Sequence, residues 1–299
     1  MSKALMAALG LVLTATPARG DGPVMQWGAT EPEIEASAIA GGGQFPGNHT
    51  CALEAGTDRV LCWGDDAFGQ AAPPPDVNGV EGTASAIAAG DTHSCAIRAD
   101  TGGVVCWGTN FGGYLSPPPA VDGTAGAATA IAVGPERSCA IQAGTGGVIC
   151  WPGGGIPAAV DGSEGSATSI ALGYSGGCAI QAGTGQVVCW GSPSSPPPPA
   201  VDGSEGTATA VTVGQVHSCA IQAGTGRVVC WGSEREEYVT PPSEVDGSEG
   251  TALAIASGWS HTCAIQSGTG RGVCWGGSQD GQATPPPGGD GSEGKATAI

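Results

Sequence analysis

Four histidines share one place in a repeated pattern, each two residues before a cysteine. They are His49, His93, His217 and His261. A His-x-Cys pattern could bind zinc or copper, because imidazole and thiolate are ligands that these metals accept. However, the equivalent positions in two further copies hold Arg137 and Gly176. We therefore expect structural histidines and no metal site.

A second polar pattern, Asp-Gly-Ser-Glu-Gly, could hold calcium between its two carboxylates. Its copies begin at Asp161, Asp202, Asp246 and Asp290. Earlier copies read Asn78-Gly79-Val80-Glu81 and Asp122-Gly123-Thr124-Ala125, which lack the dense carboxylates of known calcium loops. Because Asp-Gly is typical of turns, we favour an acidic turn, with calcium as the alternative.

The twelve cysteines form six pairs, and the members of each pair are always eleven residues apart. The pairs are Cys51/Cys62, Cys95/Cys106, Cys139/Cys150, Cys178/Cys189, Cys219/Cys230 and Cys263/Cys274. Structural zinc sites usually separate two cysteines by two to four residues, a spacing that is absent here. The even count and regular spacing predict six disulfides, which are typical of an oxidising compartment.

No set of residues suggests catalysis. An active site normally needs one asymmetric group of side chains with shifted pKa values, whereas serines, histidines and acids here recur in near-identical copies. The paired cysteines cannot act as nucleophiles. We predict that the chain is not an enzyme and uses no cofactor.

These residues belong to six copies of one unit. The segment Cys-Ala-Ile-Gln-Ala-Gly-Thr-Gly or a looser copy recurs at intervals of 39 to 44 residues. In the fifth copy, residues 207–214, 217–222 and 227–231 read as three short strands. With Gly224 and Thr225 as a two-residue type II′ turn, Cys219 lies opposite Cys230. Each disulfide should therefore close one hairpin.

A tryptophan follows the second cysteine of every copy, as expected of a residue that packs between neighbouring sheets. These residues are Trp63, Trp107, Trp151, Trp190, Trp231 and Trp275. Residues 24–27 also resemble the third strand of a copy, and residues 296–299 resemble the first. The pattern predicts an all-β propeller of about seven blades over residues 21–299, with six complete blades and a split or incomplete closing blade.

The repeat Gly-x-x-His-Ser-Cys-Ala-Ile, followed by Gly-x-Val-x-Cys-Trp-Gly, resembles that of the regulator of chromosome condensation family. The pairs Gly69-Gln70 and Gly281-Gln282 are similar to the end of that family's repeat. The resemblance implies a seven-bladed propeller. The founding activity of the family is guanine-nucleotide exchange on a nuclear GTPase, and other members include a secreted inhibitor of β-lactamases. The resemblance therefore implies a fold more than a function.

The first twenty residues differ from the repeats. Lys3 precedes an apolar run from Ala4 to Ala15, and small residues end the segment at Gly20. This order is typical of a bacterial signal peptide over residues 1–20, and the run is too short for a membrane span. We predict a secreted, periplasmic or cell-surface protein.

The net charge of −18 arises from 27 acidic residues against nine Lys and Arg. Such a surface repels phosphate backbones, so we expect no nucleic-acid partner.

Two kinds of loop vary among the copies, namely the short loop before His-x-Cys and the longer loop after Trp-Gly. They carry most of the aromatic residues outside the repeated tryptophans. These candidate binding residues are Phe45, Phe68, Phe111, Tyr114, Tyr174, Tyr238 and Trp259. In a three-strand meander both kinds of loop open on one side, which we name the variable face. We predict a monomeric interaction module that binds a protein or surface glycan there. The alternatives are a structural spacer of the cell envelope and an exchange-factor-like regulator.

Overall fold

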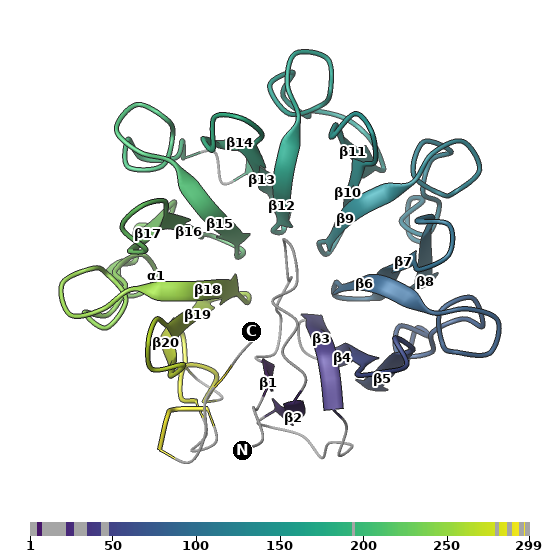
Figure 1. Ribbon diagram of the computed structural model, residues 1–299, viewed down its shortest axis with the longest axis horizontal. Coiled ribbons are helices and arrows are strands. Elements are labelled where there is room, and N and C mark those ends of the chain that lie inside the picture. The colour runs from purple at the N-terminus through teal and green to yellow at the C-terminus, as the bar shows by residue number, and fades with distance from the viewer. Residues whose placement is uncertain are drawn as a thin grey trace.

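The structure is a computed structural model that describes residues 5–7, 22–26, 35–42, 48–192, 195–278, 281–285, 289–292 and 296. Apart from the short helix α1 (Glu236–Val239), its regular elements are strands. Six antiparallel sheets stand around a common axis like the blades of a propeller (Figure 1). In the described part of the chain, no helix is long and apolar enough to cross a membrane.

Each blade contains three consecutive strands, and the first strand lies nearest the axis (Figure 1). Blades one to three contain β3 (Glu35–Gly42), β4 (His49–Glu54) and β5 (Val60–Gly64); β6 (Ala84–Ala89), β7 (His93–Arg98) and β8 (Val104–Gly108); and β9 (Ala128–Val133), β10 (Ser138–Gln142) and β11 (Val148–Trp151). Blades four to six contain β12 (Ala167–Leu172), β13 (Ser175–Gln181) and β14 (Val187–Ser192); β15 (Ala208–Val213), β16 (Ser218–Gln222) and β17 (Val228–Trp231); and β18 (Ala252–Ser257), β19 (His261–Gln266) and β20 (Gly272–Gly276). The predicted three-strand unit is confirmed.

Six disulfides lie where the cysteine spacing predicted them, each between the second and third strands of one blade. Their Cα–Cα distances are 4.0–4.1 Å. Opposed residues of antiparallel strands approach this closely only at non-hydrogen-bonded positions, where a disulfide fits. The confirmed bridges are Cys51–Cys62, Cys95–Cys106, Cys139–Cys150, Cys178–Cys189, Cys219–Cys230 and Cys263–Cys274.

The two cysteines of each bridge differ in burial, a difference that their spacing did not predict. The first cysteine lies on the middle strand of its blade and is at most 2% exposed. The second lies on the outer strand, which has a neighbouring strand on one side only, and Cys150 is the one buried example. The other five are partly exposed and pack at the margins of the cores: Cys62, Cys106, Cys189, Cys230 and Cys274.

The predicted type II′ turn is wrong, although the register derived from it is right. The backbone N–H of Gly226 donates to the carbonyl of Gln222, four residues back, so the turn is wider than two residues. The Thr225 hydroxyl also donates to the Gln222 side chain and accepts from the Arg227 N–H. These side-chain hydrogen bonds stabilise the wider turn.

The hydrophobic cores lie between blades rather than within them. Trp107 of the second blade packs against Leu53 and Val60 of the first, and the tryptophans of the next four blades repeat this contact. Five of the six repeated tryptophans are buried. The predicted packing role of the repeated tryptophan is confirmed.

A ring of glycines marks the closest approach of the blades to one another. One glycine lies at or just beyond the end of every first strand, and these are Gly42, Gly90, Gly134, Gly173, Gly214 and Gly258. A Cβ added at Gly134 would lie 2.7 Å from the carbonyl oxygen of Gly173 in the next blade. Gly42, Gly90, Gly173 and Gly214 would make a similarly close contact with the next blade, whereas Gly258 would meet the His261 ring of its own blade. A side chain therefore does not fit at these positions.

The sector between β20 and β3 differs from the predicted shared blade. Here β2 (Gly22–Gln26) pairs with β3 of the first blade, and β1 (Leu5–Ala7) pairs with β2 (Figure 1). Trp27 and residues 297–299 lie outside the described residues. Ala296 does take the place of a first-strand residue, because its N–H donates to Gly270 as that of Ala252 donates to Gly226. The shared closing blade stays a prediction, as does the signal peptide that contains β1.

Candidate functional site

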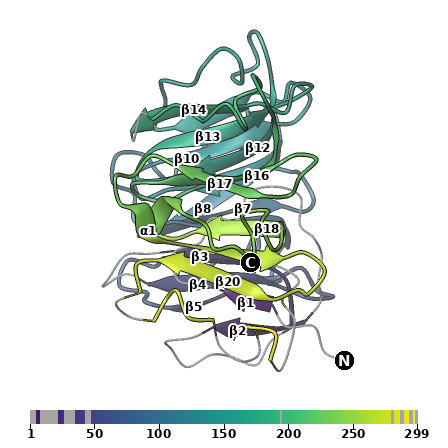
Figure 2. The same ribbon diagram turned by 90° about the vertical axis from the view of Figure 1, so that its left-hand side faces the viewer.

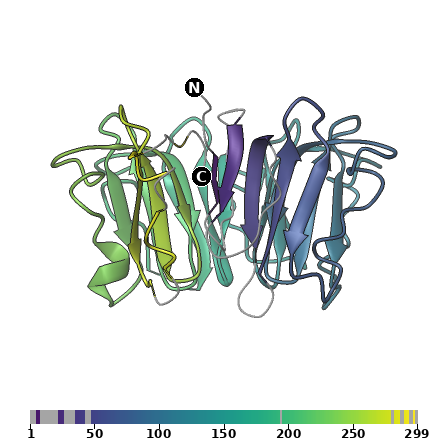
Figure 3. The same ribbon diagram turned by 90° about the horizontal axis from the view of Figure 1, so that it is seen from below.

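The propeller has two different faces. His93, at the start of β7, pairs with Gly108, at the end of β8, so the loops after β6 and after β8 leave on the same side. Thr109 N–H donates to Thr92, which joins these loops. Figure 3 shows the sheets edge-on, with α1, part of one such loop, at the lower edge. This side is the variable face, and the opposite side, with the hairpin turns, is the turn face.

The turn face uses its acidic residues to form its own backbone structure. The Asp161 carboxylate accepts hydrogen bonds from the backbone N–H and the hydroxyl of Ser163, and the equivalent aspartates of the neighbouring loops do the same. These bonds hold the pKa of each aspartate below its usual value. The predicted acidic turn is therefore present. Among the described residues, no group of three His, Cys, Asp or Glu side chains is placed to hold a metal ion.

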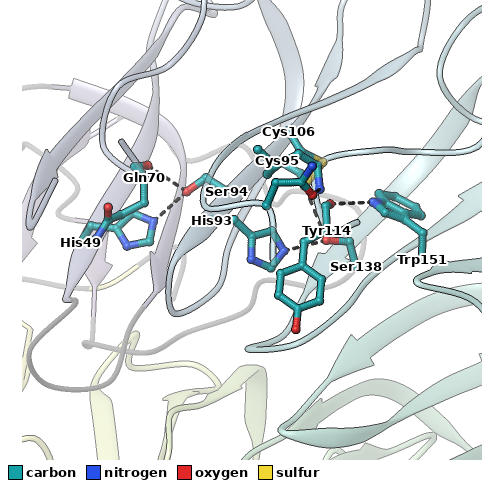
Figure 4. Close-up of a disulfide and its surroundings, with 11 residues drawn as sticks. His49, Gln70, His93, Ser94, Cys95, Cys106, Tyr114, Ser138 and Trp151 are labelled. Carbon is teal, nitrogen blue, oxygen red and sulfur yellow. Dashed lines mark hydrogen bonds between the residues drawn. A yellow bond between two sulfur atoms is a disulfide. The ribbon is translucent and has the colours of Figure 1, made fainter. Parts of the chain in front are cut away.

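Three of the four histidines of the His-x-Cys pattern connect neighbouring blades. His49 Nε2 lies 2.7 Å from the Ser94 hydroxyl, and His93 Nε2 lies 2.9 Å from the Ser138 hydroxyl (Figure 4). His217 Nε2 lies 2.7 Å from the Thr262 hydroxyl. Burial and, to a smaller extent, the nearby His49 lower the pKa of His93 to about 4. Neutral histidine can either donate or accept at Nε2, which suits a hydrogen bond to a hydroxyl group on the next blade. These side chains are thus part of the packing between blades.

Two of the predicted binding aromatics also belong to this packing. Tyr238 is only 9% exposed and lies over the His217 ring, with 5.8 Å between ring centroids. Tyr114 is half-buried and stacks on His93 at 5.3 Å (Figure 4). Its carbonyl accepts a hydrogen bond from the Trp151 indole. We therefore no longer count Tyr114 and Tyr238 among the candidate binding residues that face solvent.

The sequence does indicate that these two tyrosines pack against a histidine, through their distance from it along the chain. Tyr114 and Tyr238 both lie 21 residues after a repeat histidine, and so does Gln70. Gln70 is fully buried, and its carbonyl accepts from Trp107 as that of Tyr114 accepts from Trp151. The two tyrosines occupy the place of a buried glutamine.

The other predicted aromatics have different surroundings. Phe68 and Phe111, in the loops after β5 and β8, are 48% and 65% exposed. Phe45 lies outside the described residues. Tyr174 and Trp259 meet edge to face, with 5.7 Å between ring centroids. The structure thus leaves two exposed phenylalanines and one aromatic pair on the variable face.

The aromatic pair lines a pocket where the first strands converge on the axis (Figure 1). The glycine ring lines this pocket, and residues that directly follow a glycine of the ring form its wall. Five such residues line it: Asp91, Pro135, Tyr174, Gln215 and Trp259. Sequence analysis identified Tyr174 and Trp259 here but missed Asp91 and Gln215, which have the same position in their repeats.

Asp91 is the unusual member of this wall. Burial and, to a smaller extent, the negative charge of Glu136 on the next blade raise the pKa of its carboxyl to about 6. Within the described part of the chain, its side chain forms no hydrogen bond or ion pair. A partly buried carboxylate is normally paired, because losing water costs free energy that a partner restores.

A family comparison matches the second blade. The regulator of chromosome condensation (RCC1) repeat matches residues 84–113, from β6 through β8 into the following loop. The second blade of the propeller is thus an RCC1 repeat. The structural comparisons agree with the RCC1 repeat, since Prp20p from Saccharomyces cerevisiae, whose structure was reported with its binding to Gsp1p and histones, aligns at 17% identity and a TM-score of 0.60. The alignment covers 89% of this chain and 77% of Prp20p.

Two other solved structures resemble this chain. The CRINKLY WD40 ectodomain of the Arabidopsis thaliana receptor kinase ACR4 aligns at 24% identity and a TM-score of 0.63, covering 81% of this chain and 85% of the ectodomain. Human WBSCR16 aligns at 16% identity and a TM-score of 0.61, covering 90% of this chain and 81% of that protein. No curated protein sequence matches the chain. At these identities the comparisons establish the fold.

Proposed function

We propose that this RCC1-repeat propeller is an exported, non-catalytic interaction module that binds another protein through its variable face. The observation that carries the proposal is the contrast between the faces. The variable face has exposed aromatic rings and a pocket, whereas the aspartates of the turn face are used in its own turns. Varied loops on a rigid scaffold are the common basis of recognition.

Two further observations support the proposal. Prp20p, which has the same fold, binds Gsp1p and histones, and Kap60 binds yeast RCC1. Six disulfides are typical of a chain that works in an oxidising compartment, which agrees with export through a signal peptide. A surface glycan is the other ligand that aromatic loops favour, and the experiment below distinguishes it.

The test begins by identifying what touches the variable face. The purified chain, cross-linked in the envelope and culture fluid of the producing organism, should yield cross-links to one protein from the loops after β5 and β8. Binding of that purified protein is then measured by calorimetry. Recovery of a polysaccharide instead would identify the glycan alternative.

Phe111→Ala should weaken binding about tenfold or more, because a central aromatic anchor commonly contributes at least about 1.4 kcal/mol. Val80→Ala is the matched control, since Val80 is an exposed apolar residue of the turn face with 75% of its surface accessible. It should leave the affinity within about twofold. If Val80→Ala weakens binding while Phe68→Ala and Phe111→Ala do not, the proposed face is wrong.

A further inference from the structure

The axial pocket brings together two kinds of group that recognise positive charge. Tyr174 from the fourth blade and Trp259 from the sixth meet at its wall, and Gln215 of the fifth blade joins them through a hydrogen bond from its N–H to the Trp259 carbonyl. Asp91 lies on the same wall, in the loop after β6. Aromatic faces attract cations through their quadrupole, and a carboxylate attracts them by charge.

Asp91 has the properties of a counter-ion for a cation. It is partly buried, it lines the pocket, and it has no hydrogen bond or ion pair among the described residues. The charged group that acts on it is Glu136 of the next blade, which is also negative. Both charges therefore favour a cation at this point.

The surroundings of the pocket also favour a positively charged ligand. The chain carries a net charge of −18, so its field draws cations towards the surface. Asp91, Tyr174 and Trp259 all line this pocket, so a group that enters it would lie against their side chains. A long side chain with a charged end matches a narrow site that has a carboxylate and two rings at its wall.

We propose that the axial pocket binds an organic cation, namely the ammonium or guanidinium group of a lysine or arginine side chain presented by the partner. Asp91 is the counter-ion, and Tyr174 and Trp259 supply the aromatic faces. This inference rests on the proposed function and specifies the chemistry of its partner.

The probe is N-acetyl-arginine methylamide, and its control is the citrulline analogue, which has nearly the same shape without the charge. Binding is measured by ligand-detected NMR at pH 8 and pH 5. The arginine probe should bind about tenfold or more tightly than the citrulline probe at pH 8. Because the pKa of Asp91 is about 6, only about a tenth of it is ionised at pH 5, and binding should weaken about tenfold.

Asp91→Asn should abolish both the preference for arginine and the pH dependence. The matched control is Glu205→Gln, which removes the same charge from the turn face and should change neither. Trp259→Ala should weaken the arginine probe, whereas Tyr174→Phe, which keeps a ring, should not. Equal binding of the two probes, or unchanged arginine binding in Asp91→Asn, would overturn the inference.

The outcomes also separate this inference from the proposed function. If the arginine probe does not bind but Phe111→Ala still weakens the partner, the face is correct and the pocket assignment is wrong. If the probe binds through Asp91 but no protein contacts the variable face, the pocket assignment stands and the proposed function fails.

Discussion

At the scale of single residues, the repeated histidines show how burial determines the role of a titratable side chain. Burial lowers the pKa of His93, His217 and His261 to about 4, and a neighbouring histidine adds to the effect for the first two. Each ring therefore stays neutral near neutral pH. It can then join two blades through a hydroxyl group without burying a charge.

These shifts predict instability in acid. Between about pH 6.5 and 4 the unfolded histidines bind protons that the folded ones do not, so the free energy of unfolding should fall as the pH falls. The slope should reach about 1.4 kcal/mol per pH unit for each histidine and level off below the folded pKa. Asp91 acts in the opposite direction, because its raised pKa adds stability as the pH falls through about 6.

The measurement is urea unfolding at several pH values with the disulfides intact. His217→Gln should reduce the slope between about pH 6.5 and 4, whatever it does to stability near neutral pH. A slope that is unchanged by His217→Gln would show that another group causes the loss of stability.

The surroundings of single residues also explain why sequence analysis did not predict the burial of two tyrosines. Loop membership correctly put Tyr114 and Tyr238 on the variable side, but it contains no information about burial. Their rings fill the site of Gln70 against a histidine of the same blade. Their distance from the repeat histidine could have revealed this, because a fixed offset indicates a fixed contact.

At the scale of strands, the cysteine spacing predicted the hairpin register because two opposed positions fix every other pair. The turn type could not be obtained in the same way. It depends on Thr225 and Gln222 side chains that compete with backbone hydrogen bonds, and several turns are compatible with one register.

The glycine ring gives a prediction for the ends of the first strands. Gly134→Ala should destabilise the fold by about 1–3 kcal/mol, because the new Cβ would lie 2.7 Å from a backbone oxygen of the next blade. Gly153→Ala is the matched control, since its nearest neighbour would be 3.4 Å away. Thermal unfolding of both variants tests this. Equal melting temperatures would mean that the blades can move apart at little cost.

At the scale of the whole molecule, the six blades follow one another around the axis, and β1 and β2 lie next to the first blade (Figure 2). The repeat period made this architecture predictable. The pairing of β2 was not predictable. Its few residues are compatible with a place beside the first blade and with a place in a closing blade next to β20. The structure pairs it with β3.

This pairing predicts a global role for a short segment. Deleting residues 21–30 should lower the melting temperature of the entire propeller, because β2 covers the edge of the first blade. Calorimetry of the chain with and without residues 21–30 measures the change. Identical transitions would show that the first blade needs no cover.

The placement of the disulfides also affects how the chain can reach its oxidised state. Twelve cysteines can pair in roughly ten thousand ways, yet every native bond joins a cysteine to the next one along the chain. A hairpin can therefore oxidise correctly as soon as its own two cysteines have been synthesised, before those of the next copy appear. The order in which the cysteines appear is itself the order of native pairing, so this protein can fold oxidatively without reshuffling its bonds.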